Sequence, residues 1–236
     1  MLKITIFIIF AYFLAVKQVS AQSIERSRVI DVYADEHLKI AGGQSTLYYG
    51  KEQMAHPRGT THPYLEDEQY AKARLSYNRI VYPEVMLRLD LNRDELVILS
   101  PDFRNIVLSP QNFNYAELHG KRIIYFRSDN FTGSPATGFY SLLHSGECKV
   151  LKKQTAKWTE NSRNAREFHF VQSSRFFLFY NDAYYNIRNR RGLLKIMQPY
   201  KNELKQFISA NRLHFKRDAD KFIAETVKEY EKLSGL

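Results

Sequence analysis

Hydrophobic and polar residues alternate through much of the chain between residues 73 and 187, and polar turns interrupt the alternation about every ten residues. The segment Gly138–Lys153 is central to this pattern, because two arms rich in apolar and aromatic residues flank a His144–Glu147 turn, although the arm 138–143 does not alternate cleanly. We expect Gly146 inside the turn to supply the positive φ that tight hairpin turns often need. The pattern predicts a series of β-hairpins.

The most regular alternation lies in Val85–Leu91, where four aliphatic residues face one way and Arg88 and Asp90 face the other. Besides this strand and the two hairpin arms, we expect strands at residues 46–50, 74–77, 79–82, 95–99, 106–108, 113–118, 121–126, 167–171, 175–180 and 184–187, and a loop at 54–68. Antiparallel strands in this number twist and curl, so we expect a meander shaped as a half-barrel or roll.

The hydrophobic period becomes helical after Arg190. Leu193, Leu194 and Met197 fit a first short helix, and Pro199 suits the first turn of a second. A third helix begins near residues 215–218. Its apolar stripe comprises Phe222, Ile223, Thr226, Val227, Tyr230 and Leu233. We expect the stripe to pack on the sheet or its edge; a membrane-surface or partner-binding helix is the alternative.

The predicted fold class is therefore α+β, a curved antiparallel β-sheet followed by C-terminal helices. We divide the chain into a signal peptide (1–21), an N-terminal extension and loop (22–70), an antiparallel sheet core (71–190) and C-terminal helices packed on the sheet (191–236). A length of 236 residues suits one domain. The 16 Tyr and 16 Phe residues favour a β-rich one.

The first 21 residues have the features of a signal peptide. Lys3 precedes the thirteen-residue apolar run Ile4–Val16, and small residues at 19–21 suit signal peptidase. The run is shorter than the roughly 20 residues that span a bilayer. We expect cleavage after Ala21 and a periplasmic or secreted protein without a transmembrane span; an uncleaved anchor is the alternative.

The chain is basic, with a net charge of +10. Removal of Lys3 and Lys17 with the signal peptide leaves 33 basic against 25 acidic residues, or +8. In a cytoplasmic protein this charge would suggest nucleic acid, whereas an exported one can meet anionic lipid heads, acidic glycans or acidic partners. A solvated basic surface without a specific ligand is the simplest interpretation.

Cys148 is the single cysteine, so the chain cannot form an internal disulfide. Its position at the start of a predicted strand indicates a small core residue. A catalytic thiolate would need a histidine base, for which His144 across the turn is the candidate. We do not expect this pair to be catalytic.

Several segments from Leu47 to the C-terminus resemble a family of exported proteins of uncharacterised function from the Bacteroidota. The matching segments are Leu47–Gly50, His62–Leu65, Val81–Val85 continuing to Leu89–Leu91, Gly138–Tyr140 with Leu142-Leu143, Val150–Lys153 and Glu203–Phe215. Members often have Tyr-Asp where this chain has Leu89-Asp90. The resemblance implies an envelope protein, and it carries over no catalytic residue.

Motifs of the large enzyme classes are missing from the sequence. It contains no Gly-x-Ser-x-Gly, no His-Glu-x-x-His and neither of the common glycine-rich phosphate loops. One cysteine cannot build a thiolate zinc cluster or a Cys-x-x-Cys redox pair. We therefore predict no catalytic, cofactor-binding or metal-binding residue and no cofactor.

Two groups of residues were nevertheless weighed as sites. His56 and His62 with Glu66 or Asp67 carry metal-ligand chemistry, but a proline-rich loop does not preset a coordination geometry. A glycosidase-like pair among Asp90, Asp94 and Glu95 needs a fixed carboxylate separation. We expect these three to be turn and surface residues.

The segment 166–191 interleaves aromatic and basic residues and can bind a glycan or another anionic polymer. Alternation on a strand would place half of the rings in the core, which is the interpretation we favour. The rings are Phe168, Phe170, Phe176, Phe177, Phe179, Tyr184 and Tyr185, and the cations are Arg175, Arg188, Arg190 and Arg191. The Arg188–Lys195 cluster resembles a nucleic-acid-binding helical unit, which the export signal argues against.

We expect a non-enzymatic binding or interaction module of the cell envelope. Its partner would be a lipid or other amphiphile in the curve of the sheet, or an envelope protein, and not nucleic acid. The alternative is a hydrolase of an unrecognised type that acts on an envelope or glycan substrate. That alternative predicts convergent histidine and carboxylate residues in one pocket.

Overall fold

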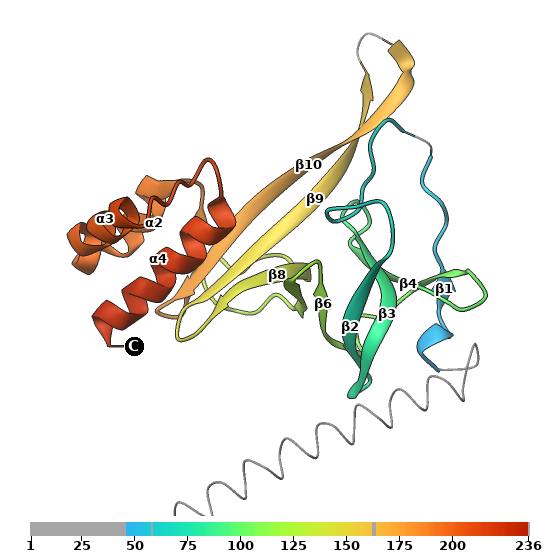
Figure 1. The fold of residues 1–236 in the computed structure, drawn as a ribbon, viewed down its shortest axis with the longest axis horizontal. Coiled ribbons are helices and arrows are strands. Elements are labelled where there is room, and N and C mark those ends of the chain that lie inside the picture. The colour runs from blue at the N-terminus through green and yellow to red at the C-terminus, as the bar shows by residue number, and fades with distance from the viewer. Residues whose placement is uncertain (1–45, 58, 162–163, 236) are drawn as a thin grey trace, which may run out of the picture.

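A computed structural model describes residues 46–57, 59–161 and 164–235. The predicted signal peptide and the extension to residue 45 lie outside the described residues. Within them, a twisted antiparallel sheet of eleven strands precedes a group of helices (Figure 1), which confirms the α+β prediction. No helix of the described part is both long enough and apolar enough to cross a membrane.

The sheet is open, with β1 and β11 at its two edges and the order β1-β5-β4-β3-β2-β6-β7-β8-β9-β10-β11. The strands are β1 Lys51–Glu52, β2 Ala71–Tyr77, β3 Ile80–Asp90, β4 Glu95–Leu99, β5 Asn105–Val107, β6 Phe113–Leu118, β7 Lys121–Phe126, β8 Gly138–Ser145, β9 Lys149–Asn161, β10 Asn164–Tyr180 and β11 Ala183–Ile187. The helices are η2 Thr46–Tyr48, α2 Arg190–Ile196, η3 Gln198–Tyr200, α3 Lys201–Ala210 and α4 Ala219–Ser234.

Two strands predicted on either side of Pro83 are one continuous strand, β3. Proline lacks the N–H that a sheet ladder needs, so it is tolerated mainly at edges and bulges. The pairing of β2 with β3 shifts register between Ala73 and Leu75, opposite Pro83. Because of this register shift, β3 continues past Pro83 although the proline cannot donate a ladder hydrogen bond.

The prediction of two separate strands at 167–171 and 175–180 was also wrong. They belong to β10, which pairs with β9 along a long two-stranded ribbon (Figure 1). Residues 154–166 are mostly polar, so their sequence did not suggest a strand. The ribbon's even-numbered side chains share one face, with Trp158 opposite Phe170 and Val150 opposite Leu178.

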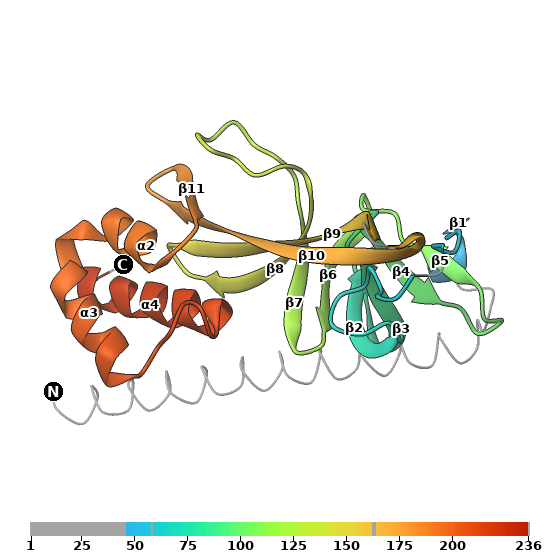
Figure 2. The same ribbon diagram turned by 90° about the horizontal axis from the view of Figure 1, so that it is seen from above.

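The ribbon joins two hydrophobic cores. Phe170 and Trp158 pack with the first core, which β2–β7 build and which includes Leu75, Leu87 and Ile98. Val150 and Leu178 pack with the second core, between the sheet and the helices. The helices α2, α3 and α4 lie at one end of the molecule and β2–β5 at the other (Figure 2).

Residues 53–57 and 59–65, here called the strap, cross the polar face of β3. The strap forms backbone hydrogen bonds from Leu65 to Leu89 and from Leu91 to Pro63, at 2.9 and 2.8 Å. Just before it, residues 46–48 form the 3₁₀ helix η2, which corrects the strand predicted at 46–50. On the polar face of β3, Gln53 and His56 of the strap cover Asp90, whereas Glu84 and Met86 stay exposed.

The helices follow local sequence signals. Asp218 caps α4 by accepting a hydrogen bond from the Lys221 amide at 3.0 Å, and Gly235 ends α4 in the left-handed conformation. The predicted stripe of α4 is buried from Phe222 to Tyr230 in the second core. Pro199 lies in η3 rather than in the first turn of α3.

Candidate functional site

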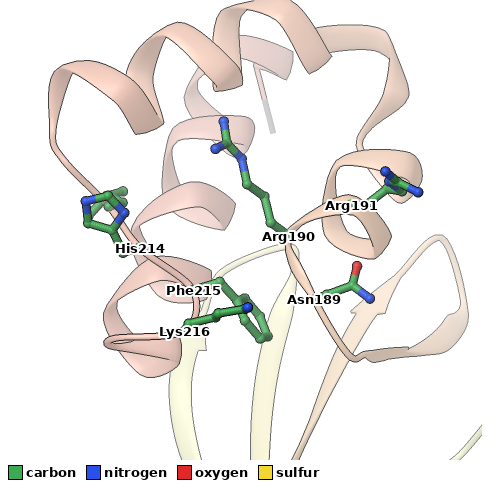
Figure 3. Close-up of a pocket in the computed structure, with 7 residues that line it drawn as sticks. Asn189, Arg190, Arg191, His214, Phe215 and Lys216 are labelled. Carbon is green, nitrogen blue, oxygen red and sulfur yellow. The ribbon is translucent and has the colours of Figure 1, made fainter.

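Arginine and lysine side chains cluster near the point where the chain passes from the last strand, β11, into the helices. One side of this site is the junction of β11 with α2, and the other is the loop 211–218 between α3 and α4 (Figure 3). Figure 3 shows Asn189, Arg190 and Arg191 on the first side and His214 and Lys216 on the second. Two segments more than twenty residues apart thus face each other.

Local contacts fix both sides. The Asn189 side chain accepts a hydrogen bond from the Gly192 amide at 2.9 Å, which caps α2 and sets the direction in which the chain leaves β11. On the other side, Leu213 is buried in the second core. Phe215 packs edge-on against Phe176 and Phe222, with ring centroids 6.3 and 5.6 Å apart. These anchors turn the polar residues of the loop outward.

The surface between the two sides contains three hollows of about 460, 250 and 480 Å³. Phe215 lines the first and the third, while Leu213 and His214 line the first and the second. Neighbouring hollows share lining residues, and we call the three adjoining hollows together the cationic groove.

Eight cationic side chains line the groove, all of them exposed. They are Arg175, Arg188, Arg190, Arg191, Arg212, Lys216, Arg217 and Lys221. Asp218 is the one carboxylate among the lining residues of these hollows, and it is engaged as the cap of α4. The groove therefore carries a strong excess of positive charge.

The eight cations lack carboxylate partners within 4.0 Å in the part of the chain that the structure describes. Two lysines of strand β9, in contrast, have carboxylate partners. Lys152 pairs with Asp220 at 2.8 Å and Lys153 with Asp94 at 2.6 Å. Guanidinium groups without partners offer fork-shaped donors for carboxylate, sulfate or phosphate oxygens.

The two histidines weighed as metal ligands do not converge with the acidic residues. The His62 ring accepts a hydrogen bond from the Tyr64 amide at 3.3 Å, Glu66 pairs with Lys121 at 2.8 Å, and Asp67 accepts from the Gln69 amide. Among the described residues, no group of three or more His, Cys, Asp and Glu side chains is placed to hold a metal.

His56 instead forms a buried pair with Asp90, at 2.5 Å between Nε2 and Oδ2. Asp90 is fully buried, which corrects its prediction as a surface residue. Its Oδ2 also accepts from Gln53 at 2.8 Å, and its Oδ1 accepts from the amides of Asn92 and Arg93 at 2.9 and 3.0 Å. Asp90 thus stabilises its turn, as predicted, and additionally holds the strap.

The other two acids near this turn have structural partners. Asp94 pairs with Lys153 and accepts from the Phe139 amide at 3.3 Å, and Glu95 accepts from Gln53 at 3.4 Å. The hydrolase hypothesis requires histidine and carboxylate groups in one pocket. His56, His62 and Glu68 line one cavity, whereas Asp90, which pairs with His56, is fully buried outside that lining and fixes the strap.

Cys148 is fully buried in the second core, as predicted. Burial and the nearby Glu231 carboxylate raise the pKa of the thiol to about 11. His144 hydrogen-bonds Glu231 at 2.7 Å rather than the cysteine. A buried thiol with a raised pKa is a poor nucleophile.

The aromatic residues of segment 166–191 divide between the core and more exposed positions. Phe170 and Phe176 are buried. The partly exposed rings are Phe168, Phe177, Phe179, Tyr184 and Tyr185. Of the basic residues weighed with them, Arg175, Arg188, Arg190 and Arg191 all line the groove. The sequence signal for the loop half of the groove was the run Arg212–Arg217, which contains three further cations.

Comparisons with family models, curated proteins and solved structures find no match to the chain.

Proposed function

We propose that this protein is a non-enzymatic binding module of the cell envelope and that the cationic groove binds an extended acidic polysaccharide. The observation that carries the proposal is a set of eight cations that line three adjoining hollows and have no carboxylate partner among the described residues. Several adjoining cationic hollows suit a ligand with repeated negative charges, because successive anionic groups can meet successive arginines.

A polysaccharide is favoured over a membrane surface by the chemistry around the groove. Membrane binding is strengthened by exposed apolar side chains that enter the bilayer. The exposed large hydrophobic residues of the described part lie outside the groove lining: Tyr49, Met54, Ile80, Met86, Phe103, Phe131 and Val171. The groove is also concave, whereas a bilayer is flat on this scale.

An amphiphile in the curve of the sheet receives less support. The interior of β2–β7 is filled by the protein's own side chains, including Leu75, Leu87 and Leu96 with no measurable exposure. A lipid chain would have to displace a packed core. Nucleic acid shares the charge of an acidic glycan, and the expected export of the chain argues against it.

The test compares residues 22–236 with two variants of equal net charge. The groove variant carries Arg190→Gln, Arg191→Gln and Lys216→Gln, all at exposed positions. The control variant carries Arg79→Gln, Arg122→Gln and Arg127→Gln, which are exposed and lie outside the groove lining. Binding to alginate, neutral dextran, phosphatidylglycerol vesicles and duplex DNA is measured by titration calorimetry at two salt concentrations.

We expect alginate to bind and dextran not to bind, with affinity falling at higher salt. The groove variant should lose about tenfold or more in affinity and the control less than about twofold. Equal losses in both variants would show attraction by net charge alone and contradict the proposal. Tighter binding to vesicles or DNA than to alginate would replace the polysaccharide by that ligand.

A further inference from the structure

A second cavity lies at the far end of the molecule from the helices, between the strap and β3. Its volume is about 530 Å³, within the range of small-molecule sites. Arg88 of β3, Tyr64 and His62 of the strap, Glu68, Asn105 and Phe170 contribute to its wall. It shares no lining residue with the cationic groove.

The guanidinium of Arg88 is held between two aromatic rings. Its central carbon lies 4.0 Å from the centroid of Tyr64 and 4.3 Å from that of Tyr70. The Tyr70 hydroxyl donates to Asn105 Oδ1 at 2.7 Å, which fixes the second ring. Stacking on both faces leaves only the in-plane N–H groups for hydrogen bonding.

These in-plane donors are poorly used. One terminal nitrogen of Arg88 donates to Gln53 Oε1 at 3.2 Å. The Nε atom is fully buried and has no hydrogen-bond partner within the described residues. Glu68 lines the same cavity without forming an ion pair with Arg88. A partly buried guanidinium with an unsatisfied donor is costly, and an anion bound at its remaining N–H groups offsets part of that cost.

The hydrogen bonds among the residues next to Arg88 leave its Nε without a partner within the described residues. The Gln53 side chain accepts a hydrogen bond from Arg88 and donates one to Asp90, and Asp90 also pairs with the His56 ring. Gln53 and the Asp90 carboxylate are therefore committed to fixing the strap. Two acidic residues lie near Arg88: Asp90 is fully buried, and Glu68 lines the cavity. A ligand with one negative charge suits this setting better than a dianion.

We propose that this cavity is a binding site for a small carboxylate-bearing molecule, up to roughly the size of a dipeptide, whose carboxylate is received by Arg88. A planar carboxylate can accept hydrogen bonds from the terminal N–H groups of the guanidinium. Phe170 and Pro63 on the wall offer apolar contact to the rest of the ligand.

Trp158, the single tryptophan, provides the readout. Its ring lies 4.9 Å from that of Phe170, which lines the cavity. Tryptophan fluorescence of residues 22–236 is titrated with N-acetylphenylalanine, its carboxamide and inorganic phosphate. The carboxamide differs from the acid only in lacking the charge.

We expect a saturable change with the acid and none with the carboxamide. Arg88→Lys keeps the charge but removes the fork, and it should weaken binding about tenfold. Arg122→Lys is the matched control, because Arg122 also stacks on a tyrosine, 4.2 Å from Tyr115, but lies outside the cavity. Arg122→Lys should bind the acid like the unchanged protein. The groove variant should also bind it like the unchanged protein, and this result would distinguish the cavity from the proposed polysaccharide site.

Equal responses to the acid and the carboxamide, or no response to either, would overturn the proposal. Tighter binding of phosphate would overturn the choice of a carboxylate. Thermal unfolding checks the fold of Arg88→Lys. If that variant does not fold, the contrast between acid and carboxamide in the unchanged protein decides the outcome.

Discussion

The carboxylate of Glu231 on α4 contacts the imidazole of His144 on β8, with 2.7 Å between Oε2 and Nε2. Its other oxygen accepts a hydrogen bond from the Cys148 amide, also at 2.7 Å. One side chain thus joins the last helix to the hairpin between β8 and β9. Gly146 allows this approach, because a Cβ there would lie 2.5 Å from the Glu231 oxygens.

We expect Glu231→Gln to lower the free energy of unfolding by about 1–3 kcal/mol, because a mostly buried charged hydrogen-bond acceptor is lost. Glu229→Gln is the control on the same helix, since Glu229 pairs with the exposed Lys232 and should change stability by less than about 0.5 kcal/mol. Urea unfolding of both variants measures the difference. Equal stabilities would mean that the Glu231 contacts contribute nothing measurable.

The buried thiol of Cys148 should react only when the second core opens. We expect labelling by Ellman's reagent to be far slower in the folded protein than in urea, because the side chain has no exposure and its pKa is raised to about 11. Rapid labelling without denaturant would contradict the burial of this residue.

The raised pKa of Cys148 also predicts a loss of stability in alkali. The folded protein favours the neutral thiol, so this contribution is complete below the ordinary pKa of 9.0 and is lost as the pH rises towards about 11. Cys148→Ala removes the titrating group. Its stability should therefore fall less steeply across this interval in pH-dependent urea unfolding. Parallel curves for the two proteins would refute the assignment.

Asp90→Asn should destabilise the protein by about 2–4 kcal/mol, because a buried charge that accepts four hydrogen bonds is lost. Asp182→Asn is the control: Asp182 is exposed at a turn with φ 55°, a conformation that asparagine also adopts. Thermal and urea unfolding compare the two. An Asp90 variant as stable as the control would show that the strap does not depend on this network.

Gly138→Ala should be more harmful than Gly120→Ala. Both positions have positive φ, 154° and 69°. A Cβ at Gly138 would collide with the Asp94 carboxylate and the Lys153 ammonium, whereas nothing lies within 4 Å of one at Gly120. We expect a loss of about 1 kcal/mol at Gly120 and more than about 2 kcal/mol at Gly138. Similar losses in urea unfolding would mean that the ion pair moves aside freely.

Local sequence signals determined much of the fold. Alternation predicted β4, β6, β7 and β11, an apolar stripe at helical spacing predicted α4, and the change of period at Arg190 located the helices. These features depend on residues close together in the chain, so their energetics can be judged from short segments. The basic and aromatic residues of 166–191 were weighed as a binding surface with core as the favoured interpretation, and four of their arginines line the groove.

Tertiary structure alone decided the remaining features. The mostly polar residues 154–160 become strand because they pair with residues 168–174 of β10. Asp90 becomes buried because Gln53 and His56, more than thirty residues earlier, cover it. The groove needs two segments separated by α2 and α3, and the second cavity needs the strap to cross β3. Burial and charge pairing depend on these distant contacts, which the periodicity of a single segment cannot encode.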